Sequence, residues 1–240
     1  MLKVGAVIVT YHTSSQLLQR CLISLRANGI KDISVINNTQ ENNPGFAAAA
    51  NNGAAKLGNE YLLFINPDAF LTPGSAAAAQ DYLECHPGAG IVGFLLTSPG
   101  GQPEKHSFGR PVTPLTLITR HFTQQRVPLQ PASVGWVSGG AMLIRRNLFR
   151  QLGGFDPRFF LYWEDVDLCY RARQAGHQII FLPQAKAVHQ RGASLSDRQR
   201  KTKLYDQSAD KYFRKHYPDM ICLLVKSARS LYRFFSPLSL

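Results

Sequence analysis

The feature that most constrains this 240-residue chain is the stretch at 61–68, YLLFINPD. Five apolar residues run without interruption and then stop at Asn66-Pro67-Asp68. A short apolar run of this kind is typical of a strand that is covered on both faces, as in a parallel sheet. Proline cannot donate a ladder hydrogen bond, so we expect the strand to end there. Asp68 would then lie just beyond the carboxyl end of a buried strand, where open α/β sheets bind ligands.

Strand-like and helix-like patterns alternate around this stretch. We expect strands at 4–10, 33–36, 61–65, 91–96 and 178–182. Helices are expected at 46–57, at 73–84, and over the residues with helical apolar spacing Leu17, Leu18, Cys21, Leu22 and Leu25. This order predicts an α/β fold with a mostly parallel sheet flanked by helices. Residues 97–133 show little periodicity, and a loop of that length in a compact domain is usually functional or disordered.

Composition excludes several classes of protein. No stretch is apolar over the roughly 20 residues that a membrane span requires, and the N-terminus is expected to be a strand and not a signal peptide. The four cysteines are far apart and form no CxxC pair, which argues against a zinc site or a disulfide scaffold and fits a reducing cytoplasm. The net charge of +12 implies an anionic partner: nucleic acid, a membrane surface or a phosphorylated substrate.

Two acidic sites are candidates for chemistry. Asp68 either caps a turn or binds Mg²⁺ or Mn²⁺ beside the phosphates of a nucleotide. Glu164, Asp165 and Asp167 lie at the start of an expected helix, where negative charge favours the dipole by about 0.3–1 kcal/mol each. They also follow the aromatic run at 159–163, and acids beside an aromatic wall are candidates for a general base.

Other features are weaker when each is taken alone. His189 is either a structural histidine or a ligand, and Ser138-Gly139-Gly140 is either a flexible loop or a bulge. No G-x-x-x-x-G-K-[ST] motif is present, which argues against P-loop NTPases.

Taken in order, six blocks resemble glycosyltransferase family 2, with a GT-A fold, and in particular the rhamnosyltransferase-like enzymes of bacterial surface polysaccharides. The blocks extend across most of residues 1–195: VIVTYH (7–12), GFAAAANNG (45–53), LLFINPDA (62–69), GWVSGGAMLIRR (135–146), GGFDPRFFLYWEDVDLCYRAR (153–173) and HQRGAS (189–194). The resemblance implies a catalytic domain at 1–195, with a nucleotide-sugar half at 1–96 and an acceptor half at 97–195. A basic helical extension would follow at 196–240.

The resemblance also implies roles for individual residues. The nucleotide sugar would be held by Thr10, Tyr11, Asn37 and Asn51, with Gly139 and Gly140 leaving room for the donor sugar or acceptor. Asp68 would bind a divalent cation, Mg²⁺ or Mn²⁺, with His189 completing its coordination. Asp165 would be the catalytic base, with Glu164 and Asp167 next in line.

These roles imply a particular reaction. The donor would be a dTDP- or UDP-linked deoxyhexose like rhamnose, or a hexose, and the acceptor a hydroxyl of a polysaccharide or lipid-linked glycan. One displacement with one base predicts inversion at the anomeric carbon. One departure stands out: the family usually carries Asp-Asn-x-Ser where this chain has Asn37-Asn38-Thr39-Gln40, so the nucleotide used is open.

The C-terminal segment supplies the remaining predictions. From Arg198 to Arg233 it holds ten lysines and arginines against three aspartates, mixed with aliphatic and aromatic residues. It is either a helix packed on the domain or a surface that binds the anionic inner face of the cytoplasmic membrane. We favour the membrane surface, because the resemblance implies lipid-linked acceptors at the inner leaflet. A nucleic-acid-binding module is an alternative to the enzyme, but it would leave Asp68 and the 164–167 cluster without a role. A sugar-nucleotide-binding pseudoenzyme is a further alternative.

Overall fold

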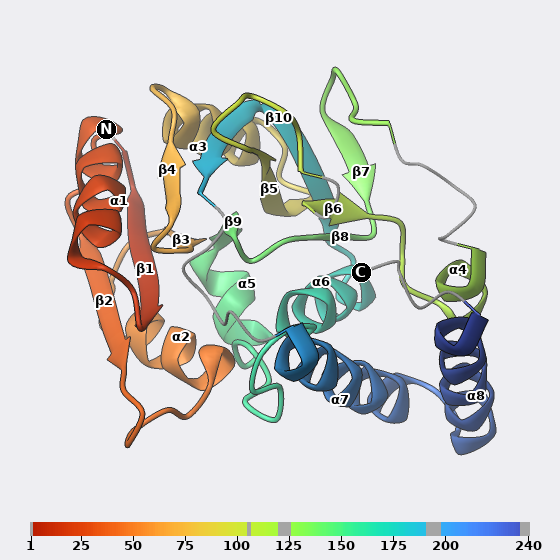
Figure 1. Cartoon of the computed structure of the whole chain (residues 1–240). Coiled ribbons are helices and arrows are strands. Elements are labelled where there is room, and N and C mark those ends of the chain that lie inside the picture. Colours follow the sequence, from red (N-terminus) through yellow and green to blue (C-terminus); the bar gives the residue numbers. More distant parts are fainter. Residues whose placement is uncertain (1, 105–106, 120–125, 191–197, 236–240) are drawn as a thin grey trace.

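The computed structural model describes residues 2–104, 107–119, 126–190 and 198–235. Its central sheet runs in the order β2-β1-β3-β9-β5-β10-β4, with β7 paired to β10 (Figure 1). The strands are β1 (Val4–Tyr11), β2 (Ile33–Asn38), β3 (Tyr61–Ile65), β4 (Ala69–Leu71), β5 (Ala89–Thr97), β7 (Ala132–Val134), β9 (Ala141–Arg145) and β10 (Gln178–His189). A small second sheet pairs β6 (Phe108–Gly109) with β8 (Trp136–Val137).

The sheet is mixed but mostly parallel. The pairs β1–β2, β1–β3 and β5–β10 are parallel, whereas β9 is antiparallel to both β3 and β5. β4 and β7 add antiparallel pairing to β10. The predicted fold class, an α/β sheet flanked by helices, is therefore confirmed.

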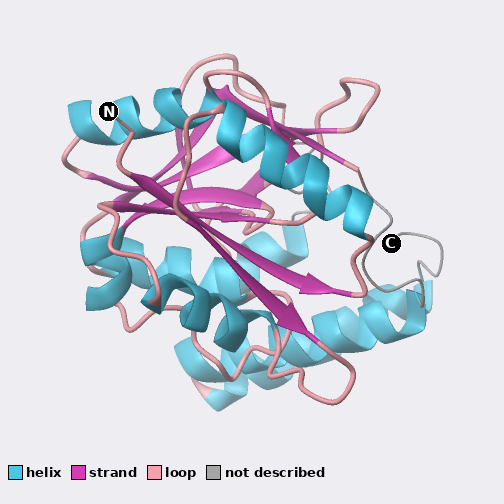
Figure 2. Ribbon diagram, turned by 90° about the vertical axis from the view of Figure 1, so that its left-hand side faces the viewer, coloured by secondary structure: helices cyan, strands magenta, loops and turns pink. Residues whose placement is uncertain are grey.

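Helices cover both faces of the sheet (Figure 2). In β3, Leu63 and Ile65 belong to one apolar core and Leu62 and Phe64 to the other, as the two-residue period of a strand requires. The first core takes side chains from α1 (Ser15–Ala27) and α3 (Ser75–Cys85). The second takes them from α2 (Phe46–Ala55), α5 (Arg146–Gln151) and α6 (Glu164–Gln174). A strand buried on both sides is thus the reason for the uninterrupted apolar run.

Two parts of the chain differ from expectation. The stretch at 97–133 is not a featureless loop, because its described residues form β6, α4 (Pro114–Thr119) and β7. These elements are too short to show a helical or strand period in the sequence. The strands β6 and β7 form because they pair with β8 and β10, which come later in the chain. The second strand also runs two residues further than expected, so Asn37 and Asn38 are strand residues on opposite faces of β2.

The described C-terminal residues form two helices, α7 (Arg198–His216) and α8 (Asp219–Phe235). They build a third apolar cluster with the aromatic residues that precede α6, in which Phe159 and Trp163 meet Tyr212, Phe213 and Val225. Within the described residues, no helix is sufficiently long and apolar to cross a bilayer.

Candidate functional site

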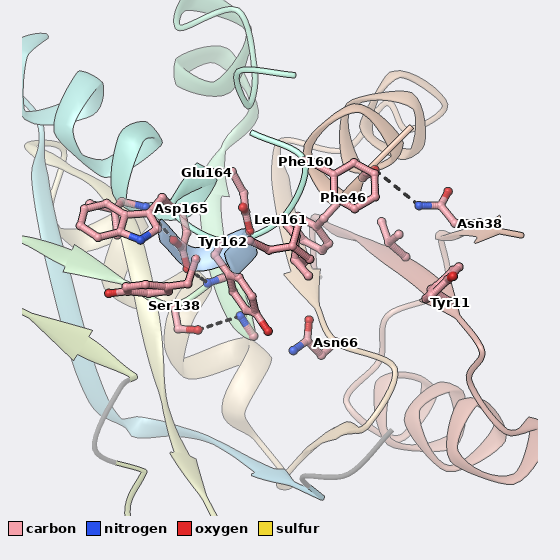
Figure 3. Close-up of a pocket in the computed structure, with 18 of the residues that line it drawn as sticks. Tyr11, Asn38, Phe46, Asn66, Ser138, Phe160, Leu161, Tyr162, Glu164 and Asp165 are labelled. Carbon is pink, nitrogen blue, oxygen red and sulfur yellow. Dashed lines mark hydrogen bonds between the residues drawn. The ribbon is translucent and has the colours of Figure 1, made fainter. Parts of the chain in front are cut away.

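A cavity of about 460 Å³ opens beside the carboxyl end of β1, the turn after β3 and the start of α6. Asp68 and Asp165 both line it, although 97 positions separate them in the sequence. Figure 3 shows Tyr11 and Asn38 on one side of this space and Ser138, Glu164 and Asp165 on the other. The structure therefore brings the two predicted acidic sites to one cavity.

The turn at Asn66-Pro67-Asp68 places the first acid. β3 ends at Ile65, and the Ala69 amide donates to the Asn66 carbonyl at 3.0 Å, which reverses the chain into β4. The Asp68 side chain is buried, and its Oδ1 lies 3.1 Å from Nε2 of His189 at the end of β10. The other ring nitrogen of His189, Nδ1, lies 3.0 Å from Oε1 of Glu104.

His189 is thus held between two carboxylates. Burial opposes the charged form of His189. The hydrogen bonds that its ring makes to the carboxylates of Asp68 and Glu104 outweigh burial, and they raise the pKa of His189 to about 9. Glu104 falls in the stretch that showed no pattern, so sequence reasoning missed it. His189 itself stands behind Asp68 and is not among the described residues that line the cavity.

The Asp68 carboxylate is the kind of hard oxygen ligand that Mg²⁺ or Mn²⁺ prefers. Nε2 of His189 lies 3.1 Å from Asp68 Oδ1 in a hydrogen bond, so the ring would have to lose its proton to bind a cation as well. Glu104 would then orient the imidazole from behind. No group of three or more His, Cys, Asp or Glu side chains that could hold a metal occurs among the described residues. Water and phosphate oxygens would have to complete such a site.

The second acidic site depends on an unusual backbone. Tyr162 and Trp163 have φ angles of 68° and 70°, in the left-handed region that non-glycine residues rarely adopt. Such residues cost about 1–3 kcal/mol each and concentrate at functional sites. Here the turn begins α6 so that both Glu164 and Asp165 border the cavity (Figure 3).

Asp165 also fixes the loop that faces it. Its Oδ2 accepts a hydrogen bond from the Gly139 amide at 2.9 Å, and its Oδ1 accepts one from the Val166 amide at 2.8 Å. Gly139 and Gly140 line the cavity as predicted residues of the site. A Cβ on Gly140 would lie 3.0 Å from Leu96, a tight contact, whereas one on Gly139 would meet Asp165 at an ordinary 3.7 Å.

The two adjacent acids differ in protonation. Burial raises the pKa of Glu164 well above its usual value, and the charge of Asp165 adds to the effect. Burial also raises the pKa of Asp165, but the amides of Gly139 and Val166 oppose this rise. Oε2 of Glu164 is buried without a hydrogen-bond partner in the described part of the chain. The two backbone amides therefore favour the charge on Asp165 over Glu164.

Asp167 is placed differently from its two neighbours. Its side chain is fully buried and does not line the cavity. Arg171, Lys215 and His216 each approach its carboxylate to 2.7 Å. Burial opposes ionisation, but the His216 hydrogen bond and the Arg171 charge hold the pKa of Asp167 below its usual range. This geometry makes Asp167 an anchor between α6 and α7.

The residues predicted to hold the nucleotide sugar also divide into those that line the cavity and those that do not. Tyr11 lines the cavity, whereas Thr10, Asn37 and Asn51 do not. Thr10 Oγ1 donates to Asn37 Oδ1 at 2.9 Å. Nδ2 of Asn51 donates to the Phe155 carbonyl at 2.8 Å, and Oδ1 of Asn51 accepts from the Phe155 amide at 2.9 Å. These two hydrogen bonds join α2 to the loop before α6.

Several lining residues were not predicted. Asn38 faces the cavity and donates to Asn43 Oδ1 at 3.1 Å, and Asn43 and Asn66 are lining residues too. The two-residue period of β2 could have singled out Asn38, because its side chain points to the face opposite Asn37. Helix α7 completes the wall of the cavity with Arg200, Leu204 and Tyr205. The ring centroids of Tyr205 and Trp163 lie 5.4 Å apart. The cavity therefore continues beyond the boundary expected at residue 195. The last four residues of the HQRGAS block, 191–194, lie outside the described residues.

Comparison with known proteins agrees with this geometry. A family model described as "Glycosyltransferase like family 2" matches residues 7–204. An N-acetylglucosaminyl-diphospho-decaprenol L-rhamnosyltransferase of Mycobacterium tuberculosis is 32% identical over 176 residues, which are 63% of this chain and 57% of that protein. Rhamnosyltransferase WbbL of Escherichia coli K12 is 27% identical over 138 residues, 55% of this chain and 52% of its own length. This chain thus matches little more than half the length of these relatives.

A solved structure supports the fold. GalNAc-T7, crystallised with UDP, GalNAc and Mn²⁺, has a TM-score of 0.61 at 15% identity and covers 89% of this chain and 50% of its own. The fold is accordingly that of the GT-A glycosyltransferases. The match of the family model across most of the sequence, on a chain with this fold, shows that the protein belongs to the glycosyltransferase-like family 2.

Proposed function

We propose that the protein is an inverting, metal-dependent glycosyltransferase that moves a sugar from a nucleoside-diphosphate donor to a hydroxyl of a glycan or lipid-linked acceptor. The observation that carries the proposal is the shared cavity, to which Asp68 and Asp165 both contribute. A rhamnose-like deoxyhexose is the favoured sugar, because the two relatives above are named rhamnosyltransferases.

The chain divides the chemistry between its two acids. A divalent cation held by Asp68, and by His189 once its ring has lost its proton, would offset the charge that develops on the leaving diphosphate. Asp165 takes the proton of the acceptor hydroxyl, whose own pKa is far above neutrality. The freed oxygen attacks the anomeric carbon while the bond to the diphosphate oxygen breaks. The attack and departure occur on opposite sides, so the configuration inverts.

Neutral Glu164 suits this division. A second ionised carboxylate beside Asp165 would repel the electron-rich acceptor oxygen and raise the proton affinity of the base. The Gly139 amide holds Asp165 in place while leaving further lone pairs on its oxygens for the hydroxyl proton. Tyr11, Asn38 and Asn43 line the cavity and would contact the nucleotide portion of the donor, and Tyr162 and Tyr205, which also line it, would contact a sugar ring.

The proposal is tested by turnover of a panel of dTDP-, UDP- and GDP-sugars with Mn²⁺ or Mg²⁺ and mixed glycan acceptors. We expect the wild type to consume a donor only with the cation present, and Asp165→Asn to lower transfer by about 10²–10⁴. Asp68→Asn should weaken cation dependence, whereas Asp81→Asn, an exposed acid outside the cavity, serves as the matched control. Donor binding without hydrolysis or transfer of any donor would identify a pseudoenzyme instead. Full transfer by Asp165→Asn would rule out this base.

A further inference from the structure

Helix α8 carries apolar side chains on two sides. Val225 is buried, and half-buried Ile221 and Cys222 pack against the third apolar cluster, which holds the helix on α7. Met220, Leu223 and Leu224 face away from that cluster and are 72%, 67% and 62% exposed. Their spacing of three and four residues puts them on one face of the helix. A helix that is apolar on both sides is typical of one that meets a further apolar phase.

A neighbouring helix carries one further exposed apolar residue. α4 lies against α8, as Figure 1 shows at the lower right, and its Leu115 is 70% exposed. Large exposed apolar residues gather here more than elsewhere among the described residues, where the remaining ones, such as Ile23 on α1 and Leu129, are scattered. Scattered apolar residues need no explanation, but a cluster on one helix indicates a contact surface.

The net charge of the C-terminal segment favours an anionic partner. Ten lysines and arginines and three aspartates fall between Arg198 and Arg233, an excess of seven positive charges. Arg229 bonds Asp206 and Asp210 at 2.8 Å each, so two of the three acids are already paired. The cations Lys203, Lys211, Arg214 and Lys226 are exposed on the same two helices.

We propose that α8 docks on an anionic lipid bilayer, with Met220, Leu223 and Leu224 entering the headgroup boundary and the surrounding cations facing lipid phosphates. Each lysine or arginine near an anionic surface favours binding, and the apolar face adds hydrocarbon burial. A second copy of the chain fits this face less well, because pairing would bring two strongly positive segments together. Nucleic acid offers phosphates but no hydrocarbon phase for the leucines.

This surface does not depend on the transfer reaction, but it is connected to the cavity. α7 holds α8 through Asp206 and Asp210 on one side and lines the cavity through Leu204 and Tyr205 on the other. Docking of α8 would therefore bring the cavity to the bilayer surface, where a lipid-linked hydroxyl can reach it.

The test is co-sedimentation of the whole protein with vesicles of mixed phosphatidylglycerol and phosphatidylcholine, and with phosphatidylcholine alone. We expect binding to the anionic vesicles at low salt, which weakens as salt screens the charges. Leu223→Ser with Leu224→Ser should lower the partition coefficient about tenfold or more, because two leucines no longer leave water. Ile23→Ser, a similarly exposed residue on α1, is the matched control and should bind as the wild type does.

Three results would overturn the proposal. They are unchanged binding by the double variant, equal binding of the wild type to neutral vesicles, and an equal loss in the Ile23→Ser control. Light scattering separates the competing occupant: a wild-type dimer that becomes a monomer in the double variant would assign the face to a second copy. Melting temperatures confirm that each variant is folded before it is scored.

Discussion

At the residue scale, adjacent acids with different environments define the chemistry of the site. Glu164 and Asp165 are neighbours in sequence and both border the cavity. Asp165 is stabilised as an anion by two backbone amides, whereas Oε2 of Glu164 is buried without a partner among the described residues. Environment, and not residue type, therefore assigns the base. Pairs of titratable groups whose pKa values are pushed apart often mark such roles.

This assignment predicts the pH dependence of transfer. Asp165 works in its ionised form, and burial raises its pKa, so kcat/KM should fall as the pH is lowered, at a pH above the ordinary aspartate value of about 3.9. Glu164→Gln should leave this acidic limb in place, because the glutamate is already neutral. The profile is measured with one donor at saturating cation. A limb at the ordinary aspartate value, or one that disappears in Glu164→Gln, would contradict the assignment.

At the element scale, the structure depends on a buried ionic joint between α6 and α7. The carboxylate of Asp167 on α6 pairs with Lys215 and His216 of α7 and with Arg171 of its own helix. Arg171 also donates to the carbonyls of Leu152 and Gly154, at 2.7 and 2.9 Å, which holds the loop after α5. Without the Asp167 carboxylate, Lys215 would keep its 2.7 Å ion pair with Asp156, whereas no carboxylate contact within the described residues would remain for Arg171 or His216.

Asp167→Asn should therefore lower the free energy of unfolding by about 3–5 kcal/mol, measured by urea denaturation. Asp210→Asn removes a half-exposed bridge to Arg229 and should cost no more than about 1 kcal/mol. The pKa of Asp167 is lower in the folded protein than in the unfolded chain. Its contribution to the free energy of unfolding is therefore fully present above the unfolded pKa, and it is lost as the pH falls through the folded pKa. The stability gap between wild type and Asp167→Asn should therefore narrow in acid. Equal losses in the two variants would show that burial does not matter here.

At the scale of the whole molecule, the C-terminal helices are part of the catalytic domain. α7 contributes Arg200, Leu204 and Tyr205 to the cavity, and Arg200 is the single lysine or arginine among the described lining residues. α7 also covers Phe159 and Trp163, which would otherwise be open to solvent. By contrast, none of the described side chains of α8 lines the cavity, although α8 packs against α7.

This arrangement predicts unequal effects of truncation. A chain that ends at residue 217 lacks α8 and should keep transfer to a soluble acceptor, with a lower melting temperature because Val225 no longer packs. A chain that ends at residue 197 also lacks α7 and should lose transfer and much of its stability. Circular dichroism melts and donor turnover measure both. Full activity in the shorter chain would show that α7 is dispensable for the cavity.

Sequence alone determined the elements whose signal is local. The run at 61–65 forms β3, because five consecutive apolar residues suit a strand covered on both faces. Proline ended that strand. From these elements followed the α/β class and the placement of Asp68 after β3, whereas the family followed from the resemblance of six ordered blocks. Tyr11, Asp68, Glu164, Asp165, Gly139 and Gly140 were all singled out and all line the cavity.

Tertiary structure decided whatever depends on which side a residue faces. Asp167 was grouped with Asp165 because they are two positions apart, yet α6 turns one toward the cavity and the other toward Lys215 and His216. Asn51 was assigned to the donor and instead bonds Phe155. Glu104 and Tyr205 are distant in sequence from their partners, His189 and Trp163. A one-dimensional pattern records the period of an element, whereas its rotation against its neighbours is fixed only when the cores pack.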